Sequence, residues 1–172
     1  CVTRRQRQMC IRDSGKSGKE PVVLQVPLRT NSWYHVGMVV DDKEQTLSLF
    51  VNGKEVGKKS YDVLLVEYLN KPYYVGAGDP NLSVWKNFYK GQISEVGLWS
   101  DALKDYEIEL IFDRGIINSK GEYSTSKLPV GVWDFKSGYS NMTFDVSGNN
   151  NHAICKNVEF ANKSLKSERE RY

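Results

Sequence analysis

Cysteine and histidine are scarce in this chain, and their scarcity excludes several common chemistries. The 172 residues include three cysteines and two histidines, and Cys1 and Cys10 both lie at the start. Tetrahedral zinc sites require clustered Cys or His ligands, and the sequence has no such spacing. Cys155 lacks a His and carboxylate signature beside it, so thiol catalysis is not predicted. It is either a small buried side chain or the partner of a cysteine upstream.

Long apolar runs and a broad basic excess are absent too. No run approaches the roughly 20 apolar residues that a helix needs to cross a bilayer, so no membrane span is predicted. Lys and Arg number 24 against 21 Asp and Glu, and residues 1–14, with four Arg and one Asp, hold the whole excess. A nucleic-acid surface needs a clustered basic face. Only Lys54, Lys58 and Lys59 cluster elsewhere, so no nucleic acid partner is predicted.

Residues 1–14 (CVTRRQRQMCIRDS) differ from the rest of the chain. They have neither the period of a strand nor that of a helix. The run resembles translated adapter sequence of the kind found at the ends of assembled environmental sequences. We therefore expect it to be non-native or disordered. The alternative is a native basic arm.

Residues 33–56 give the clearest structural signal. Apolar side chains alternate from Tyr34 to Val40 and again from Leu47 to Val51, which is the period of a β-strand. Asn52-Gly53 follows, and this pair tolerates the positive φ angles of a type I′ turn. The pattern predicts a strand followed by an antiparallel hairpin.

Further strands and one helix are predicted on either side. Residues 21–28 predict a strand with a proline near each end, and Pro27 indicates a sheet edge or the end of the strand. Short strands are predicted at 73–75 and 88–99. Ile108, Ile111 and Phe112 recur at helical spacing, which predicts a helix of about two turns that starts near Asp105 and ends at Gly115.

Five short motifs stand in a fixed order: W-x-H-V from Trp33, L-x-L-x-V-N-G-K from Leu47, Y-V-G from Tyr74, G-Q-I-S-E-V-G-L-W from Gly91, and A-L at Ala102 followed by E-I. This order resembles the laminin G-like, concanavalin A-type jelly-roll family over residues 22–115. The resemblance implies an all-β fold, an antiparallel two-sheet jelly-roll sandwich with one short helix. It also implies an extracellular or cell-surface binding module within a larger parent chain.

The domain organisation follows from these motifs. Residues 15–115 are expected to form the jelly-roll core, and 116–128 a linker. Residues 129–160 contain W-x-F and then D-x-S-G-N-x-x-H, which resembles the opening strands of the same family. Either the core is incomplete at its N-terminus and a second copy begins here, or these strands complete the first sandwich. Residues 161–172 are expected to form a charged tail.

Hydrolysis is not predicted. Retaining glucanases of this fold use two carboxylates about 5 Å apart, supplied from alternate positions on one strand face. The equivalent stretch, Ile93 to Leu98, has the single carboxylate Glu95. The sequence therefore favours a non-catalytic domain.

Calcium is the one metal that the resemblance implies. Family members hold it at the rim of the sandwich through Asp or Asn side chains and carbonyl oxygens, which are ligands that calcium prefers. The candidates are Asp145, Asn149 and Asn151, with Asp79 more distant in sequence. The alternative is an Asx turn, in which these side chains bond their own backbone.

Carbohydrate binding would use an exposed aromatic ring beside amide groups. Trp85, flanked by Asn81 and Asn87, is the candidate platform, and the alternative is that it packs beneath its loop. Trp33, Trp99 and Trp133 are expected to be core residues. His35 and His152 are expected to pack with satisfied ring nitrogens. The predicted partner is a carbohydrate or glycoprotein; the alternatives are an adhesion domain without a small ligand, or an accessory domain of a glycosidase such as a sialidase.

Overall fold

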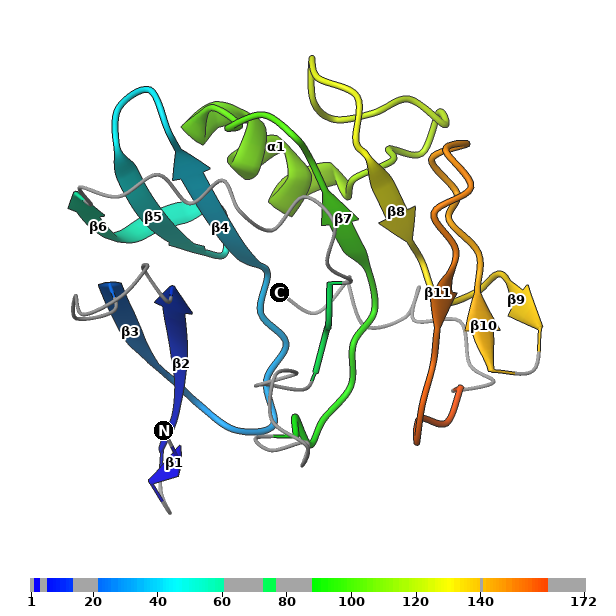
Figure 1. Ribbon diagram of the computed structural model, residues 1–172, viewed down its shortest axis with the longest axis horizontal. Coiled ribbons are helices and arrows are strands. Elements are labelled where there is room, and N and C mark those ends of the chain that lie inside the picture. Colours follow the sequence, from blue (N-terminus) through cyan, green and yellow to red (C-terminus); the bar gives the residue numbers. More distant parts are fainter. Residues whose placement is uncertain are drawn as a thin grey trace. The chain divides into compact units, whose positions relative to one another are not determined.

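The computed structural model describes residues 2–3, 6–13, 22–60, 73–76, 88–139 and 141–160 (Figure 1). Among these residues, strands form antiparallel sheets and there is one helix, α1 (Asp105–Arg114). That helix is too short and too polar to span a membrane, and the described residues contain no other helix that could. The chain divides into two units: Cys1–Val66 with Trp99–Leu128, and Glu67–Leu98 with Pro129–Tyr172.

A three-stranded sheet forms the centre of the first unit. Its strands are β4 (Val36–Asp41), β5 (Thr46–Val51) and β6 (Lys54–Ser60), paired antiparallel in that order. Asn52 and Gly53 have φ angles of 50° and 78°, which confirms the predicted turn. The structure begins β4 at Val36, later than the alternation from Tyr34 predicted.

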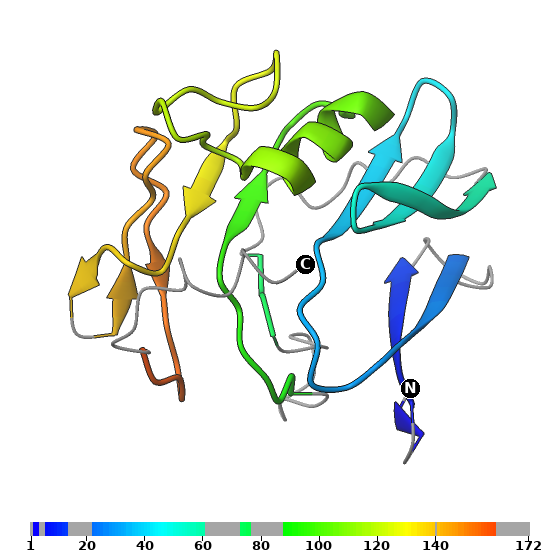
Figure 2. The ribbon, with the colours of Figure 1, turned by 180° about the vertical axis from the view of Figure 1, so that it is seen from behind.

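Strand β5 is buried on both faces. Leu47 and Leu49 form a core cluster with Leu24, which comes from β3 (Val22–Leu28). The opposite face lies against α1, because a Cβ on Gly37, the cross-strand partner of Phe50, would lie 3.5 Å from Ile108 Cγ2. Figures 1 and 2 show α1 beside this sheet. Ser48, which stands between Leu47 and Leu49, is buried as well, so consecutive positions of β5 are covered. Met38 on β4 follows the predicted alternation but is 55% exposed.

A second sheet contains the N-terminal segment. Its order is β1 (Val2–Thr3), β2 (Gln6–Asp13) and β3, and β2 pairs with β3 from Arg7↔Leu28 to Asp13↔Val22. Residues 1–14 have no strand period in their side chains, yet the structure has β2 there; the expectation that this run is non-native stays a prediction. Ladder hydrogen bonds join backbone groups, so a basic segment can pair without a strand-like side-chain pattern. Strand β3 lies at the sheet edge, as Pro27 predicted.

The helix has the predicted ends. It starts at Asp105, and Glu107 Oε2 accepts the Lys104 N–H at 2.9 Å. Gly115 ends it with φ 82°, and its N–H donates to Ile111 O at 2.8 Å. With 10 residues, α1 makes nearly three turns rather than two. The first-turn carboxylate thus supplies the cap that the Lys104 side chain lacks.

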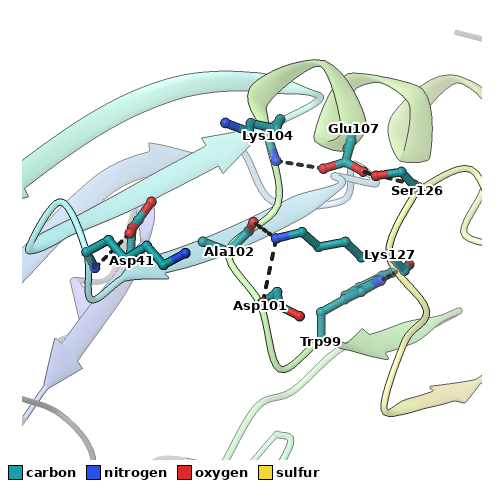
Figure 3. A network of polar contacts seen from close by, with 9 residues as sticks. Asp41, Trp99, Asp101, Ala102, Lys104, Glu107, Ser126 and Lys127 are labelled. Atoms are coloured by element: carbon teal, nitrogen blue, oxygen red, sulfur yellow. Dashed lines mark hydrogen bonds and ion pairs between the residues drawn. The ribbon is translucent and has the colours of Figure 1, made fainter.

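Residues 116–128, predicted as a linker, are held against the helix by hydrogen bonds. Glu107 Oε1 accepts hydrogen bonds from the Ser126 N–H at 2.9 Å and from Ser126 Oγ at 2.7 Å. Lys127 Nζ donates to Ala102 O at 2.9 Å and lies 3.7 Å from an Asp101 carboxylate oxygen. Figure 3 shows this network beside Trp99. The segment is therefore an integral part of the first unit.

The described residues of the second unit form two small sheets. In one, β7 (Val96–Leu98) pairs antiparallel with β8 (Gly131–Trp133). This pairing places part of the W-x-F stretch beside a strand of the predicted jelly-roll core. In the other, the order is β11 (Ala153–Ile154), β10 (Met142–Thr143) and β9 (Gly138–Tyr139).

Two strand predictions in the second unit are wrong. Residues 73–76 and 88–95 are irregular, and only 96–98 of the predicted long strand are regular. Gly76 adopts φ 80°, which turns the backbone away from an extended path. The described hydrogen bond between the two stretches runs from the Tyr89 N–H to Gly76 O at 2.8 Å. Alternating residue types therefore did not produce a ladder here.

Candidate functional site

The residues predicted to bind sugar fall in a part of the chain that the structure does not describe. Trp85, Asn81 and Asn87 lie outside the described residues, and so does Asp79. The stretches on either side, residues 73–76 and 88–93, are described. The site is therefore built from these flanking residues and from the loop that contains Asp145.

Asp145 is a buried carboxylate, 7% exposed. Its Oδ1 accepts hydrogen bonds from the N–H groups of Val132 at 2.9 Å and Ser147 at 2.8 Å, and its Oδ2 from the Asn151 N–H at 3.0 Å. Burial alone would raise the pKa of this carboxyl, but the hydrogen bonds outweigh it and hold the pKa below its usual value. The side chain is thus held as a charged acceptor for backbone donors.

The structure brings Asn149 and Asn151 close to Asp145. Asn149 Nδ2 donates to the carbonyls of Pro129 at 3.0 Å and Val130 at 3.1 Å. Asn151 Nδ2 donates to Val130 O at 2.8 Å. These two amides donate to carbonyls about 20 positions earlier in the chain, which is not the local contact of an Asx turn. Asp145 does make that local contact, because its Oδ1 accepts the Ser147 N–H two residues on. Both amides point N–H groups toward the Val130 carbonyl, and an N–H group cannot bind a cation. Calcium binding at this loop stays a prediction.

The two histidines differ in how well their ring nitrogens are satisfied. His152 Nδ1 accepts the Asp145 N–H at 3.1 Å, and its ring packs on Phe144 with 5.2 Å between centroids. The prediction of a satisfied nitrogen is confirmed for this residue. It is wrong for His35, because Nδ1 is buried without a hydrogen-bond partner in the described structure. Burial also lowers the pKa of His35.

Four aromatic side chains on the two described stretches, residues 73–76 and 88–93, are exposed. They are Tyr73 at 71%, Tyr74 at 42%, Phe88 at 59% and Tyr89 at 52%. The Tyr89 N–H bond to Gly76 O brings the two stretches together, and we call these four residues the aromatic surface.

Sequence reasoning missed the aromatic surface. The stretches around Tyr73 and Phe88 were interpreted as strands, in which alternate side chains face a core. The available signal was the two aromatic pairs, Tyr73-Tyr74 and Phe88-Tyr89. Adjacent residues of a strand point to opposite faces, so one ring of each pair would have to leave the core.

The described residues form antiparallel β-sheets, one of which packs against a short helix, and they include exposed aromatic side chains. A family model described as the concanavalin A-like lectin/glucanases superfamily, laminin G type, matches residues 3–109. The match covers more than half of the chain, and the chain belongs to this superfamily. The resemblance drawn from the five motifs is thereby confirmed.

One solved structure is similar to part of the chain. It is an S-layer domain-containing protein from Clostridium thermocellum, with 21% sequence identity and a TM-score of 0.43. The likeness covers 61% of this chain and 50% of that one, so the chain spans half the length of the structure it matches. Among curated proteins, none matches the sequence.

Proposed function

We propose that this chain is a non-catalytic recognition module that binds carbohydrate or glycoprotein outside the cell. The aromatic surface is the observation that carries this proposal. Pyranose rings present apolar C–H groups on their faces, and these pack on aromatic rings while hydroxyls remain free for hydrogen bonds. Membership of a superfamily that includes lectins supports the same reading. The two-sheet jelly roll that we expect for members of this superfamily would place such a surface on a rigid β scaffold.

The carboxylates support a non-catalytic role. Glu95 is the one acidic residue between Ile93 and Leu98, whereas a retaining mechanism needs two. The buried carboxylates of Glu107 and Asp145 accept hydrogen bonds from neighbouring backbone groups. Their geometry supports a structural use, as acceptors that hold the helix and the Asp145 loop in place.

A glycan-array screen of the whole chain tests the proposal. It is performed in calcium and in chelator, with Trp85→Ala beside the native protein. Tyr139→Ala is the matched control, because Tyr139 is 79% exposed but lies on β9, outside the aromatic surface. We expect saturable binding to at least one glycan, unchanged by the control substitution.

Three results discriminate the alternatives. Loss of binding in Trp85→Ala would place the predicted platform in the same site as the aromatic surface. Loss in chelator would support the calcium prediction at the Asp145 loop. Absence of binding to every glycan, with a folded protein, would overturn the proposal and favour an adhesion domain without a small ligand.

A further inference from the structure

Asn141 begins an N-x-T triplet at a turn of the second unit. The triplet is Asn141-Met142-Thr143, and such triplets are acceptors for N-linked glycans on exported proteins. Strand β9 ends at Tyr139 and β10 begins at Met142, and these two residues are cross-strand partners. Asn141 therefore lies in the turn between the two strands, and it is exposed there. A surface turn is the kind of place that accommodates a bulky glycan.

The side-chain amide of Asn141 is available for modification. It makes no hydrogen bond with the residues that the structure describes, whereas Asn149 and Asn151 use their Nδ2 groups to donate to backbone carbonyls. The backbone of Asn141 is held, because its carbonyl accepts the Cys155 N–H at 2.6 Å. The turn thus fixes the main chain and leaves the amide nitrogen open to solvent.

Thr143, the third residue of the triplet, is hidden in the folded protein. Its side chain is 0% exposed, and its Oγ1 donates to Ser137 O at 3.2 Å. The triplet is defined by a hydroxyl at this position, so a transferase must reach it. Attachment at Asn141 is therefore expected before β9 and β10 pair, while the chain is still unfolded.

Three apolar side chains form a row across the sheet beside this turn. Met142 is paired with Tyr139 on one side and with Ile154 on the other, and directly paired residues of antiparallel strands share a face. Tyr139 is 79% exposed and Ile154 69%. Thr143 follows Met142 and points to the opposite face, which is the buried one. The row therefore lies on the solvent side of the sheet.

We propose that Asn141 carries an N-linked glycan whose first sugar packs on the exposed ring of Tyr139. Asn141 Nδ2 attacks the anomeric carbon of a polyprenyl-diphosphate-linked oligosaccharide. A C–N bond forms, the bond from the anomeric carbon to the phosphate oxygen breaks, the polyprenyl diphosphate leaves, and the amide proton passes to a base of the transferase.

The row gives the attached sugar an apolar surface within reach. Tyr139 is two residues before Asn141, and the C–H groups of a pyranose ring pack on an aromatic face. A covalently attached sugar has a high effective concentration at its neighbour, so even a weak contact is populated. The inference rests on export from the cell, which is one part of the proposed function, and does not depend on ligand binding.

Secretion of the whole chain from mammalian cells, behind a secretion signal, tests the attachment. Asn81→Gln and Asn162→Gln remove the other two triplets, so Asn141 is the sole acceptor. We expect peptide mass spectrometry to find a glycan at Asn141 in most of the secreted protein. Asn141→Gln and Thr143→Ala are expected to abolish it. Asn157→Gln, at an exposed asparagine outside any triplet, is the control and leaves it in place.

An unmodified Asn141 in the secreted, folded protein would overturn the attachment. If the double variant is not secreted, the peptide map of the native chain decides. The order of events is tested with purified transferase and lipid-linked oligosaccharide. We expect a synthetic peptide of residues 136–146 to be modified and the folded chain not to be. Equal modification of both would overturn the requirement that attachment precedes folding.

The contact with Tyr139 is tested through stability. The single-acceptor glycoprotein is compared with the same sequence produced in bacteria without the glycan. We expect the glycan to raise the melting temperature by about 2 °C, Tyr139→Phe to keep this increment and Tyr139→Ala to lose it. An increment that survives in Tyr139→Ala would overturn the contact. A glycosylated chain that binds nothing on the array would keep this inference and lose the proposed function, and the reverse result would do the opposite.

Discussion

Phe50 and Phe88 are the same residue type in opposite environments. Phe50 is 1% exposed on the central strand of a three-stranded sheet, and Phe88 is 59% exposed in an irregular stretch of the second unit. Strand β5 has a neighbour on each side within the sheet and a packed layer on each face. Residues 88–95 precede the short strand β7 and have no ladder of their own.

The difference shows how the two regions divide their tasks. Burial of apolar side chains stabilises the fold by roughly 25 cal/mol per Å², and around β5 that surface is already removed from water. In the aromatic surface it remains available to a ligand. The same chemistry therefore contributes to folding in one region and, under the proposed function, to binding in the other.

The most direct test of this difference is to replace each phenylalanine by alanine. Phe50→Ala is expected to lower the free energy of unfolding by about 4 kcal/mol, because it removes a fully buried ring and leaves a cavity. Phe88→Ala is expected to change it by less than about 0.5 kcal/mol, because the ring is already exposed. Urea unfolding of the whole chain measures both. Equal losses in the two variants would show that Phe88 is a core residue.

A smaller effect is expected at Glu107, a buried carboxylate of the first unit that is 1% exposed. Burial by itself would raise its pKa, but hydrogen bonds from Lys104 and Ser126, with Lys127 nearby, lower the pKa below 4.5. Glu107→Gln is expected to cost about 2 kcal/mol at pH 7, because an amide cannot accept all of these hydrogen bonds. Glu109→Gln, at an exposed position on the same helix, is the control.

The pH dependence of that loss follows from the sign of the shift. A carboxyl whose pKa is lower in the folded state contributes stability fully above its unfolded value, here 4.5, and loses it as the pH falls through the folded value. The stability difference between native and Glu107→Gln proteins should therefore shrink below about pH 4.5. A difference that stays constant down to pH 2 would contradict the charged state of Glu107.

Local chemistry made part of this structure predictable. Asn52-Gly53 and Gly115 were predicted because positive φ angles are required at those points, and Ile108 and Ile111 because helical spacing places them on one face. The Asp145 loop was predictable as a group because its members lie within a few residues of one another. The turn and the helix depend on sequence neighbours alone, whereas the contacts of the Asp145 loop also reach Val130 and Val132.

What could not be predicted depends on partners distant in sequence. Ser126 donates to Glu107 across 19 positions, and no short motif indicates this contact. Strand β2 pairs through its backbone, which side-chain patterns do not reveal. The exposure of Tyr73 and Phe88 depends on what covers them, and an apolar alternation predicts a strand whether or not a neighbouring strand exists.

The smallest expected effect concerns His35, whose Nδ1 is buried without a partner in the described structure. Its ring lies 6.0 Å from that of Phe112, and its backbone N–H and C=O bond Asn52. Burial lowers the pKa of His35 below 6.5, because the charged ring is poorly solvated there. As the pH falls below about 6.5, the histidine takes up a proton more readily in the unfolded chain than in the folded one, so the free energy of unfolding declines.

His35→Leu keeps the backbone bonds and removes the titrating group. We expect it to abolish this decline in the free energy of unfolding between pH 6.5 and 5, while shifting stability at pH 8 by a constant amount. Urea midpoints measured across this range test it, and an unchanged slope in His35→Leu would assign the pH dependence to another group.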